Sequence, residues 1–527
     1  MDNKNIIENG KTALGIEFGS TRVKAVLIDE NSNVLASGSH EWENQLADGY
    51  WTYSLEDVHY ALKDCYSNLK KAVKEKYGCT LKTVGAMGIS AMMHGYIPFD
   101  KQGNQLAEFR TWRNTTTGKA SEELTEKLSF NIPQRWTASH IYQAILNEEE
   151  HVPQVAYVTT LAGYVHYILT GVNAVGIGEA SGIFPIDSDK NDYNEEMLQV
   201  FDSLTKQKGF EKNLRDILPK VLLAGENAGY LTEKGALLLD ERGELCAGVP
   251  FAPCEGDAGT GMVATNSVKI RTGNISAGTS VFLMLVLEKK LSKVYPEIDM
   301  VTTPTGKPVA MVHCNNCTSD INAWGSVLHS FAKLLGSDAS KGNVYDLMYE
   351  AASKADYDCG GLVSYNYFSG EPVTGFTEGR PMFVRNPDSK FTFENFMLCE
   401  LYSAMATLRI GFELLKDENV SVDALYGHGG FYIYPGVGQQ ITAAALDCDV
   451  SVMKTAGEGG PYGMALLALY SVAGKGKSLE DFLSEKVFRG ASCVTVKPDE
   501  ERKNGFNAFL KKYKNGLQAE AEAVKSI

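Results

Sequence analysis

Residues 13–29, ALGIEFGSTRVKAVLID, place the carboxylate of Glu17 inside an apolar run and follow it with a Gly-Ser-Thr triplet. Apolar residues alternate before the triplet as they do in a β-strand, and the residues after it resume a strand. A further strand at residues 33–38 predicts a β-meander. We expect Glu17 and Thr21 to face each other across its first turn.

The triplet Gly19, Ser20 and Thr21 has a chemistry of its own. Its backbone N–H groups are unobstructed and its two hydroxyls suit phosphate oxygens. A nearby carboxylate, Glu17, suits the magnesium that accompanies nucleotide phosphates, usually through water. The alternative is an ordinary hairpin with Glu17 at an exposed edge.

Composition limits the function classes. The chain has 527 residues and is 44% hydrophobic, which is enough for two large domains. Its formal net charge of -15 argues against binding nucleic acids or membrane surfaces and favours a small-molecule ligand. The start, MDNKNIIENGK, has no signal-peptide core, and the 10 cysteines are scattered as in a reducing compartment. We therefore expect a cytoplasmic protein.

The chain alternates between β-rich and helical stretches, with glycines at the junctions, which is typical of an α/β fold. Ser54 is expected to cap a helix whose apolar residues recur at helical spacing as far as Val73. Thr392 is a second expected cap, before an apolar stripe that ends at Leu415. The tail, residues 499–527, predicts a surface helix or a packing arm.

Two later turns resemble the first in composition. Residues 274–280 again bring glycine and hydroxyl side chains together before a strand that begins at Val281. The sequence LYGHGG predicts a strand that ends in a glycine turn at residues 427–430, where the backbone can approach a flat purine closely. Each turn, taken alone, also fits a tight connection without a ligand.

Common nucleotide and metal motifs do not fit this chain. Ser471 stands where a P-loop ending in Gly476, Lys477 and Ser478 needs its first glycine, and Tyr462 interrupts the dinucleotide pattern in TAGEGGPYG. The pair in CNNC, residues 314–317, has no second pair at zinc-ligand spacing.

Asp257 lies between Gly256 and Ala258 at the expected start of a helix. A carboxylate with such small neighbours can approach a substrate hydroxyl and accept its proton as the hydroxyl attacks phosphorus. The alternative is a helix cap, for which aspartate is favoured.

Together these motifs resemble the FGGY carbohydrate kinases, which have an actin-like ATPase fold. The resemblance rests on GIEFGSTRVKAVLID, GDAGTG, ISAGTS and GHGG, in family order and over nearly the whole chain. It implies two domains of ribonuclease-H-like topology with a nucleotide cleft between them. We place these domains at residues 1–262 and 263–527.

The resemblance also implies roles for these residues. Asp257 would be the catalytic base, and Glu17, usually an aspartate in the family, would serve Mg²⁺. The residues implied to bind ATP are Gly19, Ser20, Thr21, Lys24, Gly278, Thr279, Gly429 and Gly430.

The sugar pocket is implied by a likeness to D-xylulose kinases. Met93, His94 and Gly95 look like their M-H-G step, and residues 138–146 and 317–324 are also similar. Polar groups beside one aromatic wall suit a polyol. The residues implied to bind sugar are Met93, His94, Gly95, Trp112, Asn114 and Asp257.

Xylulose kinases usually carry Trp-Asn-Asp where this chain has Trp112, Arg113 and Asn114. Other sugars of the family, such as L-ribulose, L-fuculose or gluconate, therefore stay open. So does a non-catalytic nucleotide-binding regulator of the same fold, although Asp257 and His94 argue against it. A homodimer is also open.

Overall fold

The computed structural model describes residues 2–453, 459–474 and 476–527. The rejected glycine-rich stretches at residues 455–463 and 471–478 lie partly outside these residues. The chain forms two compact units: unit 1 comprises Met1–Val268, Met300–Val309 and Glu458–Gly490, and unit 2 comprises Lys269–Asp299, Ala310–Gly457 and Ala491–Ile527. The boundary at residues 262/263 stays a prediction, and the two units are described separately below.

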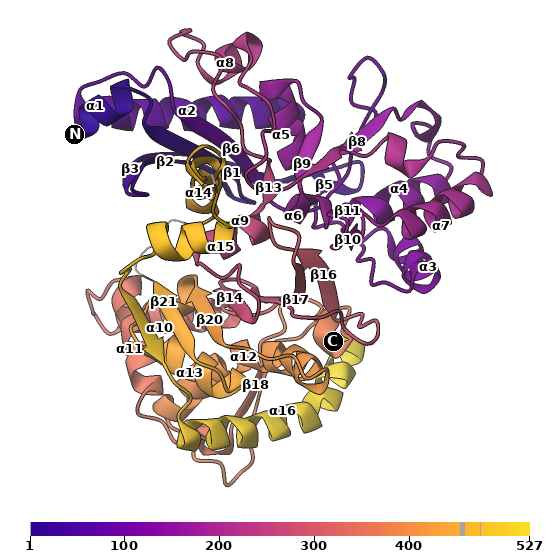
Figure 1. Ribbon diagram of the computed structural model, residues 1–527. Helices are drawn as coiled ribbons and strands as arrows, with labels where there is room; N and C mark the ends of the chain where they lie inside the picture. The colour runs from indigo at the N-terminus through magenta and orange to yellow at the C-terminus, as the bar shows by residue number, and fades with distance from the viewer. Residues whose placement is uncertain (1, 454–458, 475) are drawn as a thin grey trace. The chain divides into compact units, whose positions relative to one another are not determined.

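Unit 1 is built on a sheet with the strand order β13-β6-β1-β2-β3 (Figure 1). The first three strands in the chain form the expected antiparallel meander, and β6 and β13 add parallel strands beside β1. The strand bounds are β1 Thr12–Phe18, β2 Arg22–Asp29, β3 Val34–Glu41, β6 Ala86–Ala91 and β13 Glu255–Gly256.

Helices cover both faces of this sheet. On one face lies α2 (Leu55–Tyr77), which Ser54 caps as expected; a Cβ on Gly38 would lie 2.3 Å from the Leu69 backbone nitrogen. On the other face lies α14 (Gly459–Ala473), and a Cβ on Gly15 would lie 2.1 Å from the Pro461 carbonyl oxygen. Glycines in the strands therefore allow both helices to pack directly on the sheet backbone.

The rest of unit 1 flanks the sheet. Its helices are α1 Asn3–Glu8, α3 Gly118–Leu128, α4 Thr137–Leu146, η1 Val152–Gln154, α5 Leu161–Thr170, α6 Ile177–Ala180, α7 Glu195–Lys206, η2 Leu214–Asp216, α8 Glu233–Leu239, α9 Asp257–Ala264, α15 Leu479–Asp481 and the π-helix η7 Phe482–Val487. Its short strands are β4 Gln45–Ala47, β5 Tyr50–Thr52, β7 Ile97–Phe99, β8 Tyr157–Thr159, β9 Ala174–Gly176, β10 Ile186–Asp187, β11 Asp192–Tyr193 and β12 Lys220–Leu222.

A second sheet, most of which belongs to unit 2, repeats the arrangement with the strand order β16-β17-β15-β14-β20-β21-β22. Here β14 pairs antiparallel with β15 and parallel with β20, as β1 does with β2 and β6. The strands are β14 Thr272–Ala277, β15 Val281–Val286, β16 Ile298–Thr302, β17 Pro308–Cys314, β20 Ala424–His428, β21 Val450–Met453 and β22 Cys493–Val496. This repetition confirms the expected two-domain α/β architecture.

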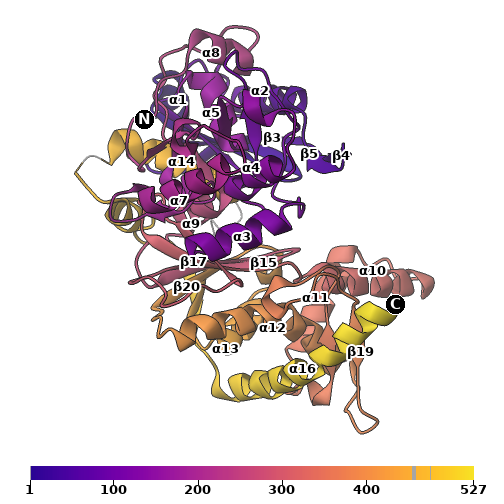
Figure 2. The ribbon, with the colours of Figure 1, turned by 90° about the vertical axis from the view of Figure 1, so that its right-hand side faces the viewer.

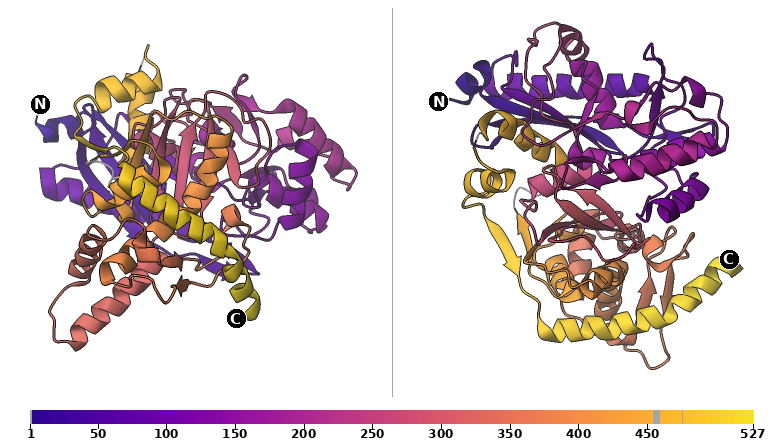
Figure 3. Two further views of the ribbon diagram at one scale, coloured as in Figure 1. Left: turned by 90° about the horizontal axis from the view of Figure 1, so that it is seen from below. Right: turned by 45° about the vertical axis from the view of Figure 1, so that its right-hand side comes forward.

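The helices of unit 2 include two that the sequence predicted. Helix α12 (Phe393–Asp417) is capped by Thr392, and α16 (Glu500–Ser526) is a packing arm that buries Phe506, Phe509 and Tyr513 (Figures 2 and 3). The other elements are α10 Ser319–Leu334, α11 Lys341–Ala352, η3 Cys359–Gly361, β18 Val363–Tyr365, η4 Pro372–Thr374, β19 Met382–Val384, η5 Gly430–Tyr432 and α13 Val437–Leu446. Among the described residues, no helix combines the length and apolar character that a membrane span needs.

Candidate active site

Glu17 lies near the end of β1, in the middle of the unit 1 sheet. Its neighbours in register are Lys24 on β2 and Ser90 on β6. The expectation that Glu17 faces Thr21 is wrong, because β1 and β2 stay paired as far as Phe18 and Val23 and leave Thr21 in the loop. The central position of β1 also rules out an exposed edge for Glu17.

The surroundings of the Glu17 carboxylate are crowded and polar. Ser90 Oγ donates a hydrogen bond to Glu17 Oε2 at 3.4 Å, and the hydroxyls of Ser90 and Thr260 lie 3.1 Å apart. A Cβ on Gly460, at the start of α14, would lie 1.5 Å from Glu17 Oε2. Loss of water, and then the charge of Asp257, raise the pKa of Glu17 to about 8. A role for Glu17 in serving Mg²⁺ stays a prediction.

Asp257 is the first residue of α9, and the preceding Gly256 occupies the cap position. Its Oδ1 accepts hydrogen bonds from the backbone N–H groups of Met93 at 3.2 Å and Ala258 at 2.9 Å. The side chain is exposed between buried neighbours. The surrounding protein raises the pKa of Asp257 to about 6, against the opposing effect of these N–H groups. Above that pH the carboxylate is ionised and can accept a proton.

The Met93-His94-Gly95 step follows β6 directly and brings a predicted sugar-binding segment to Asp257. His94 and Gly95 both have positive φ, 73° and 104°, so the chain turns sharply there. The buried His94 ring stacks on Trp136, with Nδ1 3.4 Å from the Gly182 carbonyl oxygen. A Cβ on Gly95 would lie 2.7 Å from Phe109, so this position requires glycine.

Trp112 and Asn114 have different surroundings. The indole N–H of Trp112 donates to Ser20 Oγ at 3.2 Å, and the side chain is 37% exposed. Asn114 is buried, and its amide exchanges hydrogen bonds with the backbone N–H and C=O of Trp51 at 2.8 and 2.9 Å. The structure thus joins Trp112 to the first turn and gives Asn114 a bracing contact; a role for Asn114 in sugar binding stays a prediction.

The first turn is held from within unit 1 by its carbonyl oxygens. Trp42 Nε1 donates to the Gly19 oxygen at 2.7 Å, the Tyr53 hydroxyl to that of Ser20 at 2.6 Å, and the Trp42 backbone N–H to that of Thr21 at 3.2 Å. Because all three oxygens are engaged by protein donors, the turn presents little negative charge to an anion.

The second turn, in unit 2, is braced in the same manner. Thr318 donates to the Gly278 oxygen through its backbone N–H at 3.0 Å and its hydroxyl at 2.8 Å, and the Cys317 N–H donates to the Thr279 oxygen at 2.9 Å. Gly429 lies beside this turn: its φ is 101°, and a Cβ there would lie 2.4 Å from the Ala277 oxygen. Unit 2 therefore brings Gly278, Thr279, Gly429 and Gly430 into one neighbourhood.

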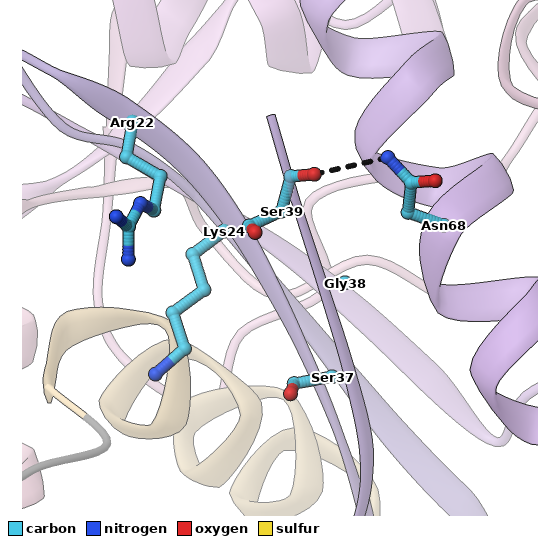
Figure 4. A pocket seen from close by; sticks show the side chains of 6 residues that line it. All are labelled: Arg22, Lys24, Ser37, Gly38, Ser39 and Asn68. Atoms are coloured by element: carbon cyan, nitrogen blue, oxygen red, sulfur yellow. Dashed lines mark hydrogen bonds between the residues drawn. The ribbon is translucent and has the colours of Figure 1, made fainter. Parts of the chain in front are cut away.

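A pocket of about 410 Å³ lies on the same unit 1 sheet and is lined in part by Lys24, the neighbour of Glu17 in register. Figure 4 shows Arg22 and Lys24 pointing to one side of the sheet, while Asn68 of α2 donates to the Ser39 carbonyl oxygen at 3.0 Å. Lys24 is in register with Glu17, and its charge lowers the pKa of that carboxyl. A role for Lys24 in binding ATP stays a prediction. The residues lining the pocket are Arg22, Lys24, Ser37, Gly38, Ser39 and Asn68.

Several residues around these groups were not predicted from the sequence. Ser90, Glu179 and Glu255 enter the neighbourhood of Asp257 through strand pairing and tertiary packing. Trp42 and Tyr53 stack at 4.2 Å beneath the first turn. The run CEGD, which places a glutamate two positions before Asp257, was the available hint for Glu255.

Comparison with protein families decides the identity of the fold. Residues 12–264 match the N-terminal domain of the FGGY family of carbohydrate kinases, and residues 273–472 match the C-terminal domain of that family. The chain belongs to the FGGY family of carbohydrate kinases.

Individual relatives of this FGGY kinase differ in their substrates. The chain is 24% identical to a xylulose kinase of Haemophilus influenzae over 430 residues, 79% of this chain and 82% of the relative. A xylulose kinase structure from Brucella ovis aligns with a TM-score of 0.77 at 18% identity, covering 97% of this chain and 100% of the other. A gluconate kinase structure from Lactobacillus acidophilus aligns with a TM-score of 0.76 at 15% identity, covering 96% of this chain and 98% of the other. These likenesses show a shared fold.

Proposed function

We propose that this FGGY kinase transfers the γ-phosphate of MgATP to a hydroxyl of a ketopentose, with D-xylulose as the leading substrate. The observation that carries the proposal is the hydrogen bond between the Met93 N–H and Asp257 Oδ1, at 3.2 Å. It joins the candidate base to the Met93-His94-Gly95 step, which resembles the sugar-binding step of xylulose kinases. The relative from Haemophilus influenzae supports the same substrate.

In the proposed mechanism, Asp257 accepts the proton of the sugar hydroxyl as its oxygen attacks the γ-phosphorus. The ADP oxygen leaves on the opposite side. His94 and Trp112 orient the sugar. Because little covalent help is needed, positioning and charge neutralisation provide most of the acceleration.

The turns are proposed to hold the nucleotide. Gly19, Ser20 and Thr21 in unit 1 and Gly278 and Thr279 in unit 2 are assigned to phosphates, and Gly429 and Gly430 to the adenosine. The carbonyl oxygens of Gly19, Ser20, Thr21, Gly278 and Thr279 are engaged by protein donors, which supports this assignment.

Mg²⁺ fits the site through Glu17. The charge of Asp257 is one cause that raises the pKa of Glu17, and a cation held beside Glu17 through water would offset that charge. No cluster of three or more metal-ligating side chains occurs among the described residues. When bound with ATP, Mg²⁺ neutralises phosphate charge.

A second candidate substrate class is a sugar acid. Arg113 follows Trp112, is exposed, stacks 3.9 Å from the Trp51 ring and donates to Asn44 Oδ1 at 2.9 Å. A guanidinium next to the proposed aromatic wall favours a carboxylate-bearing substrate such as an aldonate. A cytoplasmic setting is also proposed, because all 10 cysteines are free thiols.

The test is ADP release with MgATP against a panel of pentuloses, hexuloses, polyols and aldonates. Saturable turnover with D-xylulose supports the leading proposal. Preference for an aldonate would transfer the assignment to the second class. Hydrolysis without sugar dependence would contradict both and favour a nucleotide-binding regulator.

A further inference from the structure

Glu255, two residues before Asp257, connects the base to a distant part of unit 1. Its side chain is buried and reaches the first turn of α6. Glu255 Oε1 accepts a hydrogen bond from the Gly178 N–H at 3.3 Å, and Oε2 accepts one from the Glu179 N–H at 2.9 Å. These donors have no partner within a helix, so the carboxylate satisfies both.

The residues around this carboxylate leave space for it. A Cβ on Gly176 would lie 2.2 Å from Glu255 Oε1, and a Cβ on Gly178 would lie 2.3 Å from Oε2. Any larger residue at either position would displace the carboxylate. Glycines therefore form a cradle shaped to Glu255.

The segment that contains these glycines, residues 176–182, also contacts the other side of the candidate site. The buried Glu179 carboxylate lies against Gly256, where a Cβ would be 2.7 Å from Oε2. The Gly182 carbonyl oxygen lies 3.4 Å from His94 Nδ1. Residues 176–182 thus touch both the residue before Asp257 and the predicted sugar-binding histidine.

We propose that Glu255 is a positioning residue, which fixes Asp257 relative to the sugar hydroxyl by tying β13 to residues 176–182. This inference rests on the proposed kinase function. Phosphoryl transfer depends on alignment, and small displacements of a base cost large factors in rate. Glu255 acts through Asp257 and His94 without contacting the substrate.

Two variants disturb this link without altering Asp257. In Glu255→Gln, one acceptor is replaced by an amide N–H that faces a backbone donor. In Gly178→Ala, the new methyl group displaces the carboxylate from the opposite side. Each is expected to lower kcat about ten- to a hundredfold while KM for MgATP stays close to wild type. Because both act on one contact, the double variant should lose much less than the product of the two factors.

Glu418→Gln in unit 2 is the matched control. Glu418 is also buried and accepts hydrogen bonds from Ser292 and Tyr295, but it belongs to unit 2. It should keep wild-type kcat even if it unfolds at a lower temperature. Wild-type kcat in folded Glu255→Gln, or a multiplicative double variant, would overturn the positioning role. Wild-type protein that phosphorylates no sugar, in contrast, would contradict the proposed function itself.

Discussion

The indole N–H of Trp112 donates to Ser20 Oγ at 3.2 Å, so the candidate sugar wall and the first turn are joined by a hydrogen bond inside unit 1. Tyr53 donates to the carbonyl oxygen of the same serine at 2.6 Å. Any shift of Ser20 is therefore transmitted to the aromatic wall. If Trp112 binds the sugar and Ser20 binds phosphate, as we propose, this hydrogen bond connects the two binding events.

Replacing Trp112 by phenylalanine removes the donor and keeps an aromatic face. A hydrogen bond of this kind contributes about 0.5–1.5 kcal/mol, so we expect KM for sugar to rise roughly two- to tenfold. The Ser20→Ala variant should show a similar rise in KM for sugar. If the two losses multiply in the double variant, the hydrogen bond does not couple the two residues.

Asp257→Asn keeps the size of the side chain and an acceptor for the Met93 N–H but removes the base. Sugar-dependent kcat should fall about 10²- to 10⁴-fold. Nucleotide affinity, measured by titration of a fluorescent ATP analogue, should change little. Intact sugar-dependent turnover in this variant would exclude Asp257 as the base and strengthen the regulator hypothesis.

The pH dependence of the reaction should report the same group. The pKa of Asp257 is raised to about 6, and a base works in its deprotonated form. The kcat/KM for sugar should therefore rise tenfold per pH unit below about 6 and level off above it. A transition at the ordinary aspartate value, about 4, would mean that the surrounding protein does not raise the pKa of Asp257.

The role proposed for Glu17 can be tested through the Mg²⁺ concentration that the enzyme requires. Glu17→Gln removes one carboxylate charge, and we expect it to raise the Mg²⁺ concentration needed for half-maximal rate. Glu17→Asp retains the charge and should be affected less. Gly460→Ala is a steric counterpart, because its methyl group would displace Glu17 Oε2. A wild-type Mg²⁺ requirement in both Glu17→Gln and Gly460→Ala would contradict the assignment.

The close packing of α14 on Gly15 predicts that a larger residue at this position destabilises the protein. A methyl group there meets the Pro461 carbonyl oxygen, a backbone atom that moves only with α14. We expect Gly15→Ala to lower the free energy of unfolding by about 3 kcal/mol, visible as a lower melting temperature in calorimetry. Gly342→Ala, in an open position on α11, should be neutral or slightly stabilising. Equal melting temperatures for wild type and Gly15→Ala would mean that α14 does not pack closely on β1.

Local signals in the sequence predicted much of the fold. The meander, the caps Ser54 and Thr392, and the helix that begins at Asp257 depend on neighbouring residues, and the structure confirms them. The position of Glu17 opposite Lys24 was missed, because register depends on how far a hairpin stays paired rather than on where the glycine lies.

Other features depend on contacts between distant residues. Glu255 meets residues 176–182 only after β13 has paired with β6, and no periodicity encodes that pairing. The local sequence also does not show that residues 459–490 pack in unit 1. Their apolar pattern predicts a helix but not the sheet on which that helix packs. The sequence therefore predicted the helices and strands better than the contacts between distant residues that hold them together.

The packing of α14 on Gly15 has a consequence for biosynthesis. The strand β1 leaves the ribosome long before α14, the helix that covers one of its faces. Until α14 is made, the nascent chain must carry an uncovered apolar sheet face, exposed to aggregation. Release of a truncated product that ends before Gly459 would leave that face permanently open, which makes such fragments natural clients for chaperones and proteases.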